Sequence, residues 1–96
     1  MVDWLLRCQL QMPSWAAIPC YGTYLRTDLV GELPAVTLPV LQLMGADDPV
    51  TSADGACWVQ ERLADGRLVV FEECGHYPMF EVGARFDAEL RAFVEG

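Results

Sequence analysis

Two short apolar runs, each followed by a polar loop, organise this chain of 96 residues. The first reads LPVLQLMGADDPV at residues 38–50, and the second reads RLVVFEECGHYP at residues 67–78. Short apolar runs bounded by Pro or Gly are typical of strands in a parallel sheet. The following loops carry Asp48 and His76, the only histidine. Because open α/β sheets bind ligands at the carboxyl ends of their strands, this edge is the expected functional site.

The segment between the two runs predicts a helix, and therefore a strand–helix–strand unit. Residues 51–54 resemble a capping box with Thr51 as the cap, which predicts a helix from there to about Ala64. Gly66 is expected to end the helix in the left-handed conformation. A helix between two strands implies a parallel crossover, and its length is sufficient for one.

Helices are also expected on both sides of this unit. Residues 2–10 have apolar side chains at helical spacing, and residues 82–94 repeat them at spacings typical of an amphipathic helix. Ser14 is expected to cap another helix. Pro19 predicts that this helix is short or broken and resumes near residue 20. Residues 29–37, punctuated by Gly and Pro, are expected to form a connector.

Composition limits the size of the domain and its partners. Ninety-six residues form one small domain at most, and the hydrophobic share of 53% suggests packing against further protein. A small hydrophobic domain or an obligate oligomer would have the same composition. The six cations are all arginine and face 14 acidic residues, a net charge of −8. This charge argues against nucleic acid and anionic membranes as partners, and no apolar run is long enough for a membrane span.

The four cysteines form no CxxC pair and have no metal-ligand spacing with His76, so they predict free, buried thiols rather than disulfides or a metal site. No secretory signal is recognised at the N-terminus. Together these features predict a cytoplasmic protein without a metal. The cysteines are Cys8, Cys20, Cys57 and Cys74.

Asp48 and His76 form a candidate acid–base pair. A histidine acts as a general base when a carboxylate on one ring nitrogen fixes its tautomer. One strand–helix–strand unit separates the two residues, so their loops should meet at one edge of the sheet. Asp47 is a rival for the carboxylate role. Each residue alone is more often a structural loop residue, but their combination favours function.

The two loops resemble the C-terminal third of the α/β-hydrolase family. Residues 38–50 match the family pattern "P-v-L-x-l-x-G-x-x-D-x-v", and residues 74–81 match "G-H-x-P-x-x-E". The resemblance implies that Asp48 is the catalytic acid and His76 the catalytic base. The family acts on ester, lactone or similar carbonyl bonds of small molecules. It implies no cofactor and no metal.

The resemblance also implies a domain division and a fold class. Residues 1–37 resemble the helical segment that leaves the family's cap, together with a connector. Residues 38–96 correspond to the C-terminal part of the core. The expected fold is α/β, with about two parallel strands flanked by helices and preceded by cap-like helices.

The family's nucleophile is missing from this sequence. It precedes the acid in the chain, on a Gly-x-Ser-x-Gly turn. Neither serine, Ser14 or Ser52, has such flanking residues, and the oxyanion-hole loop is absent too. The chain is therefore expected to be a C-terminal fragment that is inactive alone. The nucleophile of the parent enzyme is left open as Ser or Asp, and acyl transfer or cofactor-free peroxidase activity is left open as well.

Two other interpretations fit the same sequence. The chain is an accessory or interaction protein that keeps only the hydrolase tail, with strand edges that favour self-association or completion of a partner's sheet. Alternatively, it is a truncated reading of a longer gene with no independent role. Two strands and about four helices make a marginal core, which favours the latter over a self-sufficient module.

Overall fold

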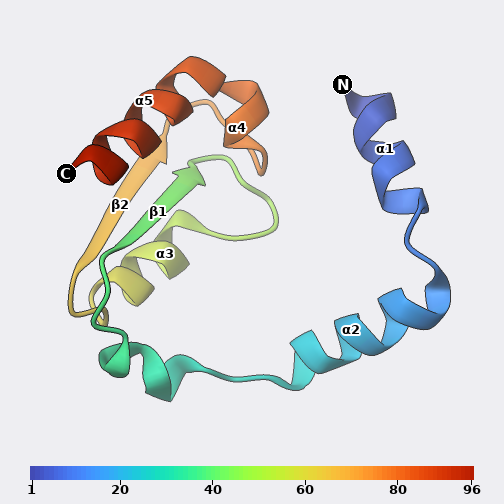
Figure 1. Cartoon of the computed structure of the whole chain (residues 1–96), viewed down its shortest axis with the longest axis horizontal. Helices are drawn as coiled ribbons and strands as arrows, with labels where there is room; N and C mark the ends of the chain where they lie inside the picture. Colours follow the sequence, from blue (N-terminus) through green and yellow to red (C-terminus); the bar gives the residue numbers. More distant parts are fainter.

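The computed structural model describes all 96 residues as a small α/β core with a helical arm. Strands β1 (Val40–Gly45) and β2 (Gly66–Phe71) form a two-stranded parallel sheet. Helix α3 (Ala53–Gln60) connects them, while α4 (Pro78–Glu81) and α5 (Gly83–Glu95) follow β2. Figure 1 shows α3 on one side of the sheet and α5 on the other. The strand–helix–strand unit and the parallel pairing predicted from the sequence are confirmed.

The alternation of side chains along β1 explains the two layers of helices. Gln42 points toward α3, and its Nε2 donates a hydrogen bond to the carbonyl oxygen of Ala56 at 3.0 Å. Leu41 and Leu43 lie on the opposite face, where Phe86 of α5 lines the same hollow. Successive side chains of a strand point to opposite faces. The side chains of a single strand can therefore pack against helices on both faces of the sheet.

The first 37 residues extend away from this core as an arm. They contain α1 (Val2–Leu10), α2 (Ser14–Arg26) and the short 3-10 helix η1 (Val30–Ala35). Figure 1 shows the arm curving around one side of the molecule, with α1 returning toward α4. None of the helices has the length and apolar character that a membrane span requires.

The arm leaves much apolar surface uncovered. The accessible surface is 7315 Å², whereas a compact monomer of 10.7 kDa exposes about 5,500 Å². The radius of gyration is 15.5 Å, against about 12.5 Å for a compact domain of this length. Of the 20 exposed large hydrophobic residues, 13 lie within the first 30 residues. The uncovered area is comparable to a protein–protein interface of standard size.

Helix α2 is continuous, so the prediction of a broken helix is wrong. Pro19 lies inside it, and helical structure continues on both sides. Proline removes one backbone hydrogen bond and disfavours a helix interior by about 3 kcal/mol, but the neighbouring bonds remain. Ser14 is also not the cap as predicted. The cap position belongs to Pro13, and no side chain caps the helix.

Helix α3 begins and ends differently from the prediction. Ser52, rather than Thr51, caps it, because the Ser52 Oγ accepts a hydrogen bond from the Gly55 N–H at 3.0 Å. The helix ends at Gln60 instead of Ala64. Gly66 is not in the left-handed conformation and instead opens β2. A Cβ at Gly66 would lie 3.0 Å from that of Leu63, so close packing accounts for the glycine.

The cysteines are free, as predicted, but only Cys74 is buried. Cys8, Cys20 and Cys57 are exposed, because the helices that carry them have faces that nothing in the chain covers. The prediction of four buried thiols is therefore wrong for three of them.

A substitution at Gly45 tests whether the close approach of the two loops at the sheet edge requires a glycine. A Cβ there would clash with the carbonyl oxygens of Cys74 and Gly75. Because these are backbone atoms, no rotamer change relieves the clash. We expect Gly45→Ala to lower the free energy of unfolding by at least about 3 kcal/mol, measured by urea denaturation. Gly83→Ala is the control. No atom lies within 4 Å of its added Cβ, so a comparable loss there would contradict this explanation.

Candidate active site

The loops that follow β1 and β2 are joined by backbone hydrogen bonds. The Ala46 N–H donates to the Phe71 carbonyl oxygen, and the Asp47 N–H to that of Cys74, both at 2.8 Å. The missing side chain of Gly45 permits this approach. The loops therefore lie side by side at the carboxyl edge of the sheet, as one crossover predicts.

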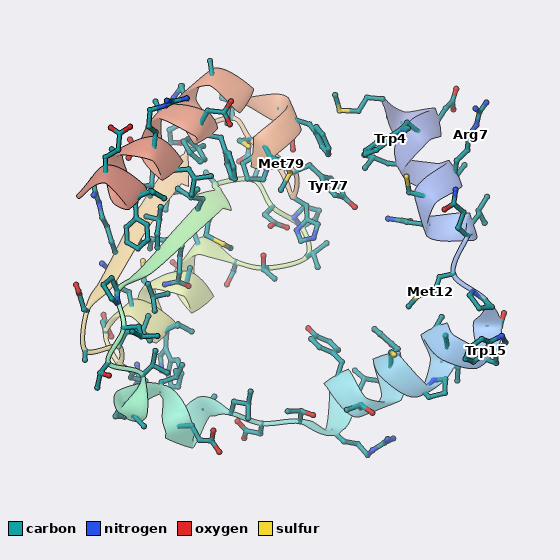
Figure 2. The ribbon with its side chains drawn as sticks, in the orientation of Figure 1. Trp4, Arg7, Met12, Trp15, Tyr77 and Met79 are labelled. Carbon is teal, nitrogen blue, oxygen red and sulfur yellow. The ribbon has the colours of Figure 1, made fainter.

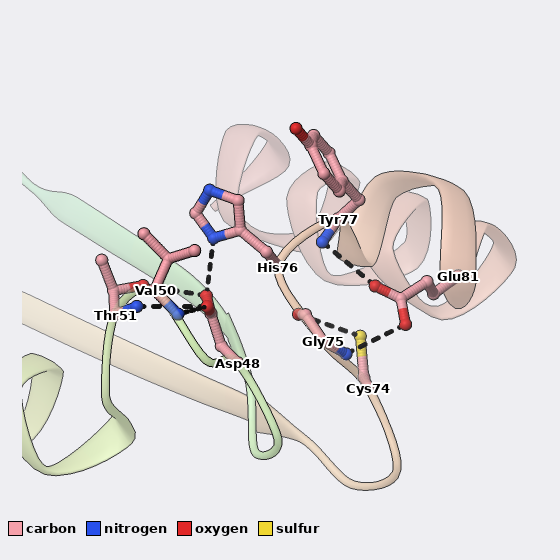
Figure 3. A network of polar contacts seen from close by, with 8 residues as sticks. All are labelled: Asp48, Val50, Thr51, Cys74, Gly75, His76, Tyr77 and Glu81. Atoms are coloured by element: carbon pink, nitrogen blue, oxygen red, sulfur yellow. Dashed lines mark hydrogen bonds and ion pairs between the residues drawn. The ribbon is translucent and has the colours of Figure 1, made fainter. Parts of the chain in front are cut away.

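Asp48 and His76 are brought into direct contact in this arrangement (Figure 3). The Nδ1 atom of His76 lies 2.8 Å from the Oδ2 atom of Asp48. The Asp48 side chain is only 4% exposed, whereas that of His76 is 40% exposed. No group in the chain is hydrogen-bonded to the Nε2 atom of His76. The histidine is thus held by one ring nitrogen and open at the other.

Three further hydrogen bonds hold the Asp48 carboxylate. Its Oδ1 accepts the backbone N–H groups of Val50 at 2.7 Å and Thr51 at 3.1 Å. Its Oδ2 accepts the Thr51 hydroxyl at 2.8 Å. Sequence reasoning used Thr51 as a helix cap and missed this role. In many turns an Asp side chain accepts hydrogen bonds from the backbone N–H groups two and three residues later in the chain. This tendency could have predicted the bonds from Val50 and Thr51.

These contacts keep Asp48 ionised. Burial alone would raise the pKa of its carboxyl group. The hydrogen bonds from His76, Val50 and Thr51 oppose this effect and hold the pKa well below its ordinary value of 3.8. A carboxylate next to Nδ1 favours the tautomer with hydrogen on that atom. The lone pair of Nε2 is then free to accept a proton.

Asp47, the rival carboxylate, does not contact the histidine. Its side chain makes no hydrogen bond and the residue is exposed. Its backbone is used instead to join the two loops. The structure therefore places Asp48, and not Asp47, against His76.

A hollow with a volume of about 340 Å³ lies beside the pair. Asp48 and His76 both line it, and most of the remaining lining is apolar. Its other residues are Leu41, Leu43, Met44, Gly45, Thr51, Pro78, Met79 and Phe86. A polar pair at the margin of an apolar hollow suits a small, largely apolar ligand.

Helix α1 reaches the loop that carries the histidine. The Gln9 side-chain amide donates to the Tyr77 hydroxyl at 3.4 Å, and the rings of Trp4 and Phe80 lie edge to face at 6.0 Å. Figure 2 shows Trp4 and Tyr77 on facing sides of the opening between α1 and α4. The tyrosine ring also stands edge-on to His76 at 5.2 Å. The arm thus has an end close to the pair.

No nucleophile is positioned against His76 within the chain. The Thr51 hydroxyl is bonded to Asp48, and the Ser52 hydroxyl caps α3. The Cys74 thiol is buried and points to the Gly75 carbonyl oxygen at 3.7 Å. The Asp48–His76 pair can accept a proton, but none of these hydroxyl or thiol groups lies where Nε2 of His76 could deprotonate it.

Comparison with known proteins finds relatives of the chain by sequence and by structure. No protein-family model matches the chain. It is 38% identical over 89 residues to the pimeloyl-(acyl-carrier protein) methyl ester esterase of Nitrosomonas europaea, covering 90% of this chain and 35% of the relative. A protein with the same name from Neisseria meningitidis serogroup B is 35% identical over 71 residues, covering 74% of this chain and 28% of the relative.

A solved structure of an α/β hydrolase also resembles this chain. MGS-M2, an alpha/beta hydrolase enzyme from a Medee basin deep-sea metagenome library, superposes with a TM-score of 0.69 at 30% sequence identity. The chain belongs to the α/β-hydrolase family. The match covers 72% of this chain but only 25% of MGS-M2. The chain therefore spans about a third of the curated relatives' length, and the predicted fold class, the C-terminal portion of the family fold, is confirmed.

The Thr51 hydroxyl provides a test of how the Asp48 carboxylate is held. Thr51→Val removes one of the hydrogen bonds that lower the pKa of Asp48, so we expect that pKa to rise toward 3.8. Thr51→Ser keeps the hydroxyl and should keep the wild-type value. Titration of the carboxyl ¹³C signal by NMR measures both. An unchanged midpoint in Thr51→Val would show that the hydroxyl has no electrostatic effect.

The same shift predicts the pH dependence of stability. Asp48 has a lower pKa in the folded than in the unfolded chain. Its ionised form therefore adds stability that is fully present above about pH 4 and is lost as the pH falls through the folded-state pKa. We expect the stability advantage of the wild type over Asp48→Asn to shrink as the pH falls from 5 to 2, followed by urea denaturation. An advantage that grows on acidification contradicts the assignment.

Proposed function

We propose that Asp48 and His76 are the acid and base of an ester-hydrolase catalytic triad whose nucleophile lies outside these 96 residues. The observation that carries this proposal is the 2.8 Å contact between the two side chains, with Nε2 of the histidine unpaired. The second support is the family relationship to esterases. Neither a metal nor a cofactor enters the proposed chemistry.

Each residue has a defined task in this scheme. Nε2 of His76 accepts the proton of the nucleophile as the nucleophile bonds to the carbonyl carbon of the ester. The same proton then goes to the departing alkoxide, which leaves as an alcohol. Asp48 stabilises the positive imidazolium in between and does not take up the proton itself. In the second half, His76 removes a proton from water, which releases the acid and restores the nucleophile.

We propose a small carboxylic ester or lactone as the substrate class. The relatives from Nitrosomonas and Neisseria carry the name of a methyl ester esterase, so methyl esters of acyl chains are the first compounds to test. The largely apolar hollow beside the pair supports this choice. The four free thiols support a reducing compartment such as the cytoplasm.

We propose further that residues 1–37 form a cap-like segment and that residues 38–96 are the C-terminal part of the hydrolase core. The contacts of Gln9 with Tyr77 and of Trp4 with Phe80 support this division, because a cap-like segment is expected to lie next to the loop that carries His76. The 96-residue chain alone is expected to be inactive toward esters, since it positions no nucleophile.

A chimera tests the function and supplies the missing groups. The aligned segment of the Nitrosomonas europaea esterase, 35% of that protein, is replaced by this chain, and hydrolysis of a short-chain nitrophenyl ester is measured. We expect activity in the chimera and a loss of about 10⁶-fold in kcat for His76→Ala. Asp48→Asn should lose roughly 10³-fold to 10⁴-fold, because the wrong histidine tautomer is favoured.

Asp47→Asn is the matched control, since it makes the same chemical change one residue away. It should change kcat by less than about threefold. Full activity in the His76→Ala chimera, or equal losses for the two aspartate variants, would refute the proposed roles.

A second function is favoured by the uncovered surface of the arm. The chain exposes about 1,800 Å² more total surface than a compact monomer, an area large enough for a protein partner, and most of its exposed large hydrophobic residues lie in the arm. On this alternative the chain is an accessory protein that self-associates or completes another sheet. Sedimentation of the purified chain over a range of concentrations tests the self-association. A constant monomer mass would remove that form of the alternative.

A further inference from the structure

The backbone on both sides of His76 is held by one side chain. The two carboxylate oxygens of Glu81 accept different peptide N–H groups (Figure 3): Oε1 accepts that of Gly75 at 3.0 Å, and Oε2 accepts that of Tyr77 at 3.1 Å. These two N–H groups belong to the residues immediately before and after the histidine. Hydrogen bonds to an ionised acceptor are roughly twice as strong as those between neutral groups.

The position of Glu81 in α4 allows its carboxylate to accept both hydrogen bonds. Its own N–H donates to the Tyr77 carbonyl oxygen at 2.9 Å as the short helix begins. Its side chain reaches back to the N–H of Tyr77, the residue that precedes the helix. Both peptide groups of Tyr77 are thus bonded to Glu81, which ties the histidine loop to a helix on the core.

Two further observations, at Gly75 and at Cys74, show that the Glu81 carboxylate lies close to this loop. A Cβ on Gly75 would lie 3.2 and 3.4 Å from the two Glu81 oxygens, so a larger residue would press against the carboxylate. Burial and then the negative charge of Glu81 raise the pKa of the Cys74 thiol. The negative charge of Glu81 therefore lies close to both Cys74 and Gly75, the two residues that precede His76.

We propose that Glu81 is a positioning residue for His76, holding the N–H groups of the two neighbouring residues, Gly75 and Tyr77, so that the imidazole meets Asp48. The direction of a side chain follows from the orientation of its own backbone. With the backbone held at Gly75 and at Tyr77, the ring reaches Asp48 without a search among loop conformations. The proposal extends the proposed acid–base role, and the carboxylate acts without touching a substrate.

NMR of the ¹³C,¹⁵N-labelled chain tests this directly, because the single histidine makes its ring signals unambiguous. In the wild type we expect scalar couplings across the hydrogen bonds from the Glu81 carboxyl carbon to the amide nitrogens of Gly75 and Tyr77. The ring ¹⁵N shifts should report the tautomer with hydrogen on Nδ1.

Glu81→Gln is the informative variant, because it keeps the size but replaces one acceptor oxygen with a donor NH₂ group. At least one of the amides of Gly75 and Tyr77 should then exchange with solvent about tenfold faster or more. The Nδ1–H tautomer of His76 should lose population. Glu72→Gln makes the same change on the same loop, where the side chain has no hydrogen bond or ion pair, and should leave both readouts unchanged.

Two results would overturn the proposal. One is the absence of both couplings in the wild type, a measurement that needs no variant to fold. The other is a Glu81→Gln chain that keeps the wild-type ring shifts of His76. Neither result depends on ester hydrolysis. An inactive chimera would therefore count against the proposed function and leave the role of Glu81 standing.

Discussion

The close approach of the two loops at Gly45 is the constraint on which the rest of the structure depends. Two backbone hydrogen bonds cross between the loops at this point, and only a residue without a side chain allows them. They set the separation of the loops before any side chain is considered. The contact between Asp48 and His76 is then a consequence of backbone geometry, and the remaining bonds to Asp48 refine it.

The site is built from local turns on a shared platform. Asp48 is held by residues within three positions of it, and the backbone beside His76 is held by Glu81, within six. The long separations in the sequence are spanned by the contact between the two residues themselves, 28 positions, and by the two backbone bonds between the loops. Such a design needs little from the protein around it to fix the orientation of each group. It is therefore compatible with a chain that provides only a small core.

The sequence predicted the parts of the fold that depend on local pattern. The apolar runs, the helix over residues 2–10 and the amphipathic C-terminal helix appear where the spacing places them. The failures have physical causes. One proline removes only one hydrogen bond, so α2 continues through Pro19, and two adjacent hydroxyl residues competed for the cap of α3. Thiol exposure depends on what covers a helix, which no local pattern contains.

The attachment of α1 has a consequence for motion. The residues between this helix and β1 include α2 and η1, so the connection is two helices with short linkers rather than a flexible loop. One long hydrogen bond from Gln9 and one aromatic contact from Trp4 hold the far end, each contributing about 1 kcal/mol. With so few contacts, α1 belongs to the low-stability part of the fold, where local opening begins. Opening there would uncover Tyr77 and Phe80 beside the histidine loop.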